Sequence, residues 1–179
     1  MFYSLSEQQP TLKIMIIGPH KVGKTTIIQR YIGHPFLPRY RVTIGVEFKT
    51  KIINVDGKPI KLVLGDCGGQ EKFIRLRKTY YTGASGGTLV YDITNRSSFE
   101  VLDQWVEEFR SVTDDSVPMV LIGNKIDLYD IREVKYEEGL KKAEVIGATF
   151  FETSAKRETE IIEAAFENLV RRKLQTQMT

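Results

Sequence analysis

The chain has 179 residues, of which 41% are hydrophobic and 27% charged, and its formal net charge is +3. This length fits one globular domain, and because no apolar run approaches ~18 residues, we expect no membrane-spanning segment. The single cysteine, Cys67, excludes an internal disulfide, and so small a basic excess does not favour nucleic acid as a partner. These facts favour a reducing, cytoplasmic setting, with peripheral membrane association only through a C-terminal extension or through partners, and we expect a monomer.

The first elements along the chain are two strands and a helix. Residues 12–18 (LKIMIIG) are nearly all apolar and β-branched, which is typical of a strand covered on both faces. A glycine-bearing turn leads into a helical pattern over about residues 25–32, and residues 33–42 lack periodicity and are expected to form a loop. Residues 46–52 alternate, which predicts a strand with one solvent-exposed face. Val46, Phe48, Thr50 and Ile52 share one face, and Glu47, Lys49 and Lys51 share the other.

Four further strands follow. Asp56-Gly57 predicts a hairpin turn, after which Ile60, Leu62 and Leu64 return on the partner strand. Helical patterns separate the remaining apolar runs, which lie at residues 87–93, 117–123 and 148–152.

Apolar residues at helical spacing mark two helices. One stripe covers residues 99–109, with Ser97 or Ser98 as its cap, and the other covers residues 161–170. The alternation predicts one α/β domain with a mostly parallel six-stranded sheet, one antiparallel edge strand and helices on both faces. In such sheets, ligands bind beyond the carboxyl ends of the strands. The expected bounds are 11–174 for the domain, 1–10 for an N-terminal tail and 175–179 for a C-terminal tail.

The turn after the first strand reads GPHKVGKT and fits the pattern G-x-x-x-x-G-K-[ST]. Backbone N–H groups of this motif surround phosphate oxygens, and the helix that follows adds its positive end. Lys24 would bridge the β- and γ-phosphates, and the Thr25 hydroxyl would bind Mg²⁺. The alternative is a plain glycine turn with an exposed lysine. The candidate nucleotide-binding residues here are Gly18, His20, Lys21, Val22, Gly23, Lys24, Thr25 and Thr26.

Asn124-Lys125-Ile126-Asp127 follows another strand and can select the base. The Asp127 carboxylate can accept hydrogen bonds from guanine N1–H and the 2-amino group, whereas adenine would leave it unpaired. The next strand ends in ETSAK, where the backbone N–H of Ala155 could donate to guanine O6. The alternative is a helix-capping loop and an ordinary turn. The candidate base-pocket residues are Asn124, Lys125, Asp127, Ser154, Ala155 and Lys156.

The segment after the third strand can sense a γ-phosphate. Asp66 could hold Mg²⁺ through water, the N–H of Gly69 could contact the γ-phosphate, and Gln70 could orient a water for in-line attack. Thr43 supplies a second hydroxyl for the metal. Because two loops would share one phosphate, its loss on hydrolysis would release both, which defines a switch.

Together these runs resemble a small GTPase of the Ras superfamily, most closely the Rab branch, over about residues 12–174. The resemblance rests on GPHKVGKT, TIGVEF from Thr43, GDCGGQE from Gly65, YYTGASGGTLVYDIT from Tyr80, GNKID from Gly123 and ETSAK from Glu152. It implies the fold of a P-loop NTPase (a small G domain), bound GTP or GDP with Mg²⁺, and slow GTP hydrolysis. It also implies effector, exchange and GTPase-activating proteins, which would bind through about residues 34–50 and 66–81.

The same resemblance assigns roles to individual residues. Lys24, Thr43 and Gln70 would be catalytic, and Thr25, Thr43 and Asp66 would form the metal set. Phe36 would lie edge-on against the guanine, and Tyr40 would lie over the phosphates.

The chain departs from the family pattern at several positions. His20 replaces a glycine of Ras proteins; its imidazole either points to solvent or lies over the γ-phosphate and crowds Gln70. Gly65 replaces the tryptophan of Rabs, which reduces their aromatic triad to Phe48 and Tyr80. The last nine residues contain no cysteine, so we expect no prenyl anchor in this chain. Cys67 is either a small filler of the switch region or a redox sensor.

The sequence is therefore compatible with three functions. The favoured one is a GTP-hydrolysing switch in Rab-like, vesicle-trafficking-type signalling. The second is a module that binds GTP with impaired turnover because of His20, and the third is an ATP-dependent P-loop kinase.

Overall fold

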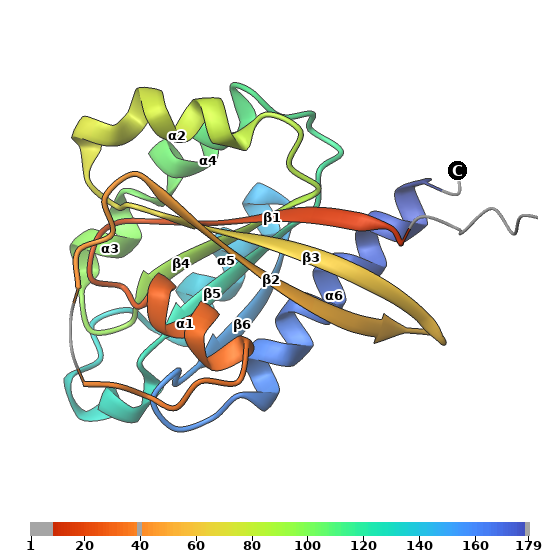
Figure 1. The fold of residues 1–179 in the computed structure, drawn as a ribbon. Coiled ribbons are helices and arrows are strands. Elements are labelled where there is room, and N and C mark those ends of the chain that lie inside the picture. The colour runs from red at the N-terminus through yellow and green to blue at the C-terminus, as the bar shows by residue number, and fades with distance from the viewer. Residues whose placement is uncertain (1–8, 39–40, 178–179) are drawn as a thin grey trace, which may run out of the picture.

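A six-stranded sheet in the order β2-β3-β1-β4-β5-β6 lies between two layers of helices (Figure 1). The computed structural model describes residues 9–38 and 41–177. Strand β2 pairs antiparallel with β3 at one edge, and all other neighbouring strands pair parallel. The predicted α/β fold is confirmed. The strands are β1 (Thr11–Ile17), β2 (Val46–Val55), β3 (Lys58–Cys67), β4 (Gly86–Asp92), β5 (Met119–Asn124) and β6 (Ala148–Thr153).

Helices cover both faces of the sheet, and each face has its own apolar core. Helices α1 (Lys24–Tyr31) and α6 (Glu160–Gln177) cover one face. The other face carries α2 (Ile74–Tyr81), α3 (Arg96–Glu100), α4 (Leu102–Arg110) and α5 (Tyr136–Ile146). Within residues 9–38 and 41–177, each helix is too short or too polar to span a bilayer. Two 3₁₀ helices complete the fold, η1 (Glu71–Phe73) and η2 (Ile126–Ile131).

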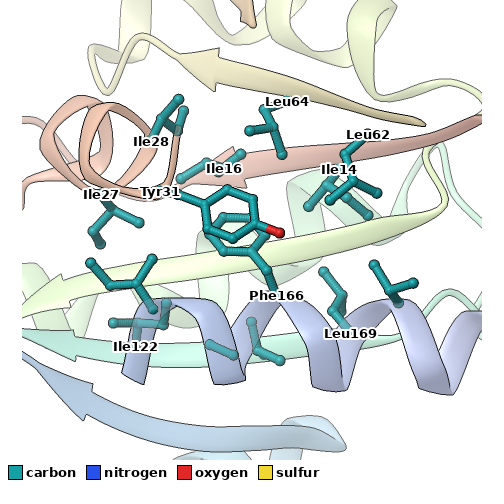
Figure 2. Close-up of a cluster of buried hydrophobic side chains, with 14 of the residues drawn as sticks. Ile14, Ile16, Ile27, Ile28, Tyr31, Leu62, Leu64, Ile122, Phe166 and Leu169 are labelled. Carbon is teal, nitrogen blue, oxygen red and sulfur yellow. The ribbon is translucent and has the colours of Figure 1, made fainter. Parts of the chain in front are cut away.

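Figure 2 shows the core in which side chains of α1 and α6 pack together against the sheet. Tyr31 of α1 stacks on Phe166 of α6, with ring centroids 4.2 Å apart, and both rings are buried. Ile27 and Ile28 of α1 are also buried against the sheet. Because α1 is held by this packing, the loop between β1 and α1 has a fixed position at the end of the sheet.

The helix predicted over residues 99–109 is divided into α3 and α4 at Val101. Neither predicted cap is correct, because the Asn95 side chain caps α3 by accepting from the backbone N–H of Ser98. Ser98 is buried within α3, and its hydroxyl donates to Asn95 O over 2.7 Å. Asn is as good a cap as Ser, and here it stands one residue before the helix begins.

Strand β2 exposes the face that carries Phe48, Thr50 and Ile52. Of the charged residues on the other face, Lys49 and Lys51 are half-buried and Glu47 is exposed. Phe48 is 40% and Ile52 63% exposed. On the opposite face, Lys51 is half-buried because its ammonium donates to Tyr31 O over 2.5 Å and lies 3.9 Å from the Tyr31 ring centroid. Alternation therefore predicts the strand correctly but does not show which face is exposed.

Candidate functional site

The sheet register brings the candidate residues to one edge of the molecule. Asp66 pairs with Ile16 across β3 and β1, and Asn124 lies opposite both Asp92 of β4 and Thr153 of β6. All these strands are parallel, so their carboxyl ends face the same side, where ligands bind in open α/β sheets.

The loop from Gly18 to Thr25 can adopt its path only with glycine at two positions. Gly18 has φ +137°, and a Cβ there would lie 2.3 Å from Val90 O. Gly23 has φ +100°, and a Cβ there would lie 2.2 Å from Nδ2 of Asn124. Because glycine has no Cβ, the loop backbone can pack closely against β4 at Gly18 and against Asn124 at Gly23.

Lys24 is buried at the base of this loop. Its Nζ donates to Gly18 O over 2.7 Å and to Pro19 O over 2.6 Å. Burial lowers the pKa of Lys24 to about 8, and the negative charge of Asp66 opposes this shift. The ammonium thus lies in a site that favours the arrival of an anion, since a nearby phosphate would stabilise its charged form.

Three oxygen-bearing side chains from separate parts of the chain converge beside Lys24. The Thr25 hydroxyl donates to Asp66 Oδ2 over 2.7 Å, and the Thr43 hydroxyl lies 3.1 Å from that of Thr25 and 3.4 Å from Asp66 Oδ2. The other carboxylate oxygen, Asp66 Oδ1, is buried without a hydrogen-bond partner. Burial raises the pKa of Asp66. Hard oxygen donors with an unpaired buried carboxylate oxygen fit a Mg²⁺ site completed by phosphate and water.

Side chains connect the segments predicted to select the base with the loop predicted to bind phosphate. Asn124 is buried; its Nδ2 donates to Val22 O over 2.9 Å, and its Oδ1 accepts from the backbone N–H of Ala155 over 3.1 Å. Asp127 Oδ1 accepts from the Ser154 hydroxyl over 2.6 Å. The N–H of Ala155, expected to face guanine O6, is therefore engaged by Asn124 in this structure.

Lys125 adds a second link between the two loops. Its backbone is left-handed, with φ 74°. The ammonium pairs with Asp92 at 2.5 Å and donates to Lys21 O over 2.8 Å. Lys156, by contrast, is exposed. Asp92 therefore contributes to the site, although no sequence motif indicated it.

A cleft of about 410 Å³ lies between the phosphate loop, the segment after α1 and the segment after β3. Gly69 packs so closely on the phosphate loop that a Cβ there would lie 2.3 Å from the backbone N of His20. The His20 side chain is exposed at the rim of the cleft. The Tyr40 prediction lies outside the described residues. Of the predicted residues, the cleft is lined by His20, Lys21, Gly23, Lys24, Thr25, Thr26, Phe36, Thr43, Gly69, Gln70 and Lys125.

Cys67 does not fit a redox sensor. Its side chain is 0% exposed, and burial raises the pKa of its thiol well above the ordinary value. A buried, protonated thiol is neither accessible nor nucleophilic. The structure therefore supports the filler interpretation.

Two charged residues near the cleft belong to none of the sequence motifs. Arg77 of α2 is buried and donates to Gly68 O and Gln70 O, and it pairs with Glu108 of α4. The sequence could have indicated Glu108, because it lies three residues after Trp105 and therefore beside the apolar stripe of its helix. Nothing in the sequence, however, pairs it with Arg77.

Comparison with known proteins agrees with this geometry. A family model described as the Ras family matches residues 13–175. The Ras-related protein RABA5c of Arabidopsis thaliana is 45% identical over 159 residues, which are 89% of this chain and 74% of that protein. RABA5a of the same plant is 41% identical over 172 residues, 95% of this chain and 77% of the relative. The chain belongs to the Ras family and is a Rab-like small GTPase.

Proposed function

We propose that this protein is a molecular switch that binds GTP and GDP with Mg²⁺ and hydrolyses GTP slowly, in Rab-like signalling of the vesicle-trafficking type. The observation that carries the proposal is the convergence of Thr25, Thr43 and Asp66 beside Lys24. Thr43 belongs to the segment after α1, so the nucleotide state would decide whether that segment is held at the site.

The proposed mechanism divides the work among the loops. Lys24 and the backbone N–H groups of its loop would hold the β- and γ-phosphates, which leaves the reacting phosphorus fixed at the mouth of the cleft. Thr25, Thr43 and Asp66 would hold Mg²⁺, which when bound neutralises charge on the phosphate oxygens. Gln70 lines the same cleft and would orient the attacking water.

Selection of guanine is assigned to Asp127. Its Oδ1 accepts from Ser154, which fixes the carboxylate in orientation. A carboxylate held in this way is complementary to two adjacent N–H donors, and a base without them leaves it unpaired.

The test compares GDP, ADP and xanthosine diphosphate as ligands of the wild type and Asp127→Asn. The wild type should prefer GDP to ADP by about 10⁴-fold, the discrimination reached by sites built on buried polar pairs. Asp127→Asn should lose most of this preference and gain affinity for xanthosine diphosphate, whose C2 carbonyl accepts from an amide. Asp130→Asn, at an exposed position of η2, is the matched control and should behave as the wild type. Equal binding of GDP and ADP by the wild type would contradict the proposal.

A second candidate function, GTP binding with impaired turnover, rests on His20. This side chain lines the same cleft as Gln70, where it can crowd the water or an arginine supplied by an activating protein. Such an arginine contributes about 10³–10⁵ in rate. If His20 impairs turnover, His20→Gly should hydrolyse GTP faster in single-turnover assays, with an activating protein and without one; equal rates leave the switch as the function. The kinase alternative is set aside because the chain belongs to the Ras family.

Partner proteins are proposed to bind over β2 and α2. Exposed apolar side chains gather on these elements, and Phe48 of β2 meets Tyr80 of α2 edge to face with centroids 5.6 Å apart. Apolar surface of this kind on a soluble domain marks an interaction site. The segments proposed to bind partner proteins are residues 34–50 and 66–81, the same as those that the resemblance implies. Their exposed apolar members among the described residues are Leu37, Val42, Ile44, Phe48, Ile74, Leu76 and Tyr80.

A further inference from the structure

Arg77 lies at the centre of a buried polar cluster behind the cleft. Its side chain is 2% exposed, and its Nε and Nη2 donate to the two oxygens of Glu108 over 2.8 and 2.7 Å. The Tyr81 hydroxyl donates to Glu108 Oε1 over 2.9 Å, and the guanidinium lies 4.3 Å from the Trp105 ring centroid. The guanidinium is therefore fixed on α4 by a bidentate ion pair and an aromatic face.

The third nitrogen of the same guanidinium reaches the segment after β3. Nη1 donates to Gly68 O over 3.0 Å and to Gln70 O over 2.5 Å. These two carbonyls flank Gly69, and Gln70 is the residue proposed to orient water. The fork of Arg77 thus connects the backbone around Gly69 to helix α4, which is packed on the sheet.

Arg77 also borders a hollow beside this segment. The hollow has a volume of about 450 Å³ and lies between Gly69, η1, α3 and α4, and Trp105 and Glu108 are among its other lining residues. Within the described residues, the hydrogen bonds of Arg77 to Gly68 O and Gln70 O connect the segment to Glu108 of α4. A lysine could not make the same set, since it lacks the planar fork with five donors.

We infer that Arg77 is a positioning residue for GTP hydrolysis, which holds the backbone of Gly68 and Gln70 so that Gln70 meets the attacking water. The inference rests on the proposed function. Its physical basis is that misplacement of a catalytic group by about 1 Å can cost about 100-fold in rate. GDP affinity depends mainly on the phosphate and base loops, which Arg77 does not contact through any of these bonds.

The test is Arg77→Lys in the full chain, loaded with GTP. Single-turnover hydrolysis should fall by about tenfold or more, while GDP affinity stays at the wild-type value. Amide hydrogen exchange of residues 68–72 in the GDP-bound protein should rise by about tenfold, because local opening becomes easier. Arg110→Lys is the matched control. Arg110 also donates to two loop carbonyls, Asp114 O and Val117 O, but these belong to the connection between α4 and β5 and not to the segment after β3.

Tyr81→Phe provides a second variant if Arg77→Lys does not fold, because it removes one hydrogen bond to Glu108 and keeps both charges. It should show a smaller change in the same direction in both measurements. The inference is overturned if a folded variant matches the wild type in hydrolysis and in exchange, or if Arg110→Lys shows the same losses. If the wild type itself does not hydrolyse GTP, the proposed function fails, and the exchange measurement still decides whether Arg77 holds the segment.

Discussion

At the scale of single residues, the burial of Lys24 is the physical basis on which we propose that it binds phosphate. The ammonium is buried and donates hydrogen bonds to the carbonyls of Gly18 and Pro19. The negative charge of Asp66 acts on it from a longer distance. Burial of a cation without a full counter-charge lowers its pKa, here to about 8. An arriving phosphate removes this cost, so part of the binding free energy comes from relief of an unfavourable state of the free protein.

This arrangement predicts a pH dependence of GDP affinity. Free protein holds Lys24 protonated below its pKa of about 8, so affinity should be flat between pH 6.5 and 7.5 and should weaken from pH 8 to 9.5. The sign follows because the bound phosphate favours the protonated lysine, so binding takes up a proton in the upper window. The slope can reach about tenfold in Kd per pH unit. Titration calorimetry in two buffers of different ionisation enthalpy measures both Kd and proton uptake.

Lys24→Arg is the control, because arginine stays charged over this range. The guanine base also loses its N1 proton at alkaline pH, and that contribution remains in the variant. A wild-type profile identical in slope to that of Lys24→Arg would contradict a lowered pKa at Lys24.

At the scale of elements, the site is assembled by links between loops. Asn124 is the last residue of β5, and it joins the loop after β1, through Val22 O, to the turn after β6, through Ala155 N. Lys125 repeats the connection through Lys21 O. The nucleotide site therefore holds its shape because three strand ends are connected, and each loop depends on the others.

Asn124→Ala should therefore speed nucleotide release as well as reduce stability. It leaves Val22 O and Ala155 N unpaired in a buried place, which should lower the free energy of unfolding by about 2–3 kcal/mol. The GDP dissociation rate should rise by about tenfold or more, because loss of about 1.4 kcal/mol of loop positioning corresponds to a factor of ten. Fluorescent-GDP exchange and thermal unfolding measure the two effects.

Asn95→Ala separates the two effects, since it removes a helix cap away from the nucleotide. This control should cost about 1 kcal/mol in stability and leave GDP dissociation unchanged. A release rate for Asn124→Ala that equals that of Asn95→Ala would refute the role of the loop links.

Elements whose signal is local could be predicted from the sequence. The turn from Gly18 to Thr25 and the Asp56-Gly57 hairpin, where both residues have positive φ, depend on a few adjacent residues. The exposed face of β2 could not be predicted, because it depends on Lys51 reaching the end of α1. The same holds for the Arg77–Glu108 pair, whose members lie 31 residues apart and contact each other only through packing of α2 on α4.

Within the site, too, local motifs could be predicted from the sequence, whereas contacts between distant residues could not. Motifs placed Thr25, Thr43 and Asp66 in one set, and these residues do converge. Motifs did not indicate that Asn124 would engage Ala155 N, because hydrogen-bond partners between two loops depend on their three-dimensional register. Sequence thus indicates the chemistry of each loop, and the fold determines how the loops hold one another.

At the scale of the whole molecule, the two sides of the candidate site differ in how deeply they are buried. The strands β4 and β5 are buried throughout, and they end in Asp92 and in Asn124, at the side of the site proposed to select the base. The segment with Thr43 has mostly exposed side chains. It meets the site through the Thr43 hydroxyl, 3.1 Å from that of Thr25 and 3.4 Å from Asp66 Oδ2, and through Gly45 O, which accepts from the Gly68 N–H over 2.7 Å. Contacts this few and this exposed correspond to low local stability.

We therefore predict that the nucleotide changes protection in only one part of the molecule. With Mg²⁺ and a non-hydrolysable GTP analogue, amide exchange over residues 41–50 and 66–81 should be slower than with GDP, because the γ-phosphate adds contacts to Thr43 and Gly69. Residues 86–92 and 119–124 should exchange equally slowly in both states. Thr43→Ala should abolish the difference over residues 41–50, whereas Thr50→Ala, on the exposed face of β2, should preserve it. Equal exchange of the two switch segments with both nucleotides would rule out a switch that acts through Thr43, even in a protein that binds GTP tightly.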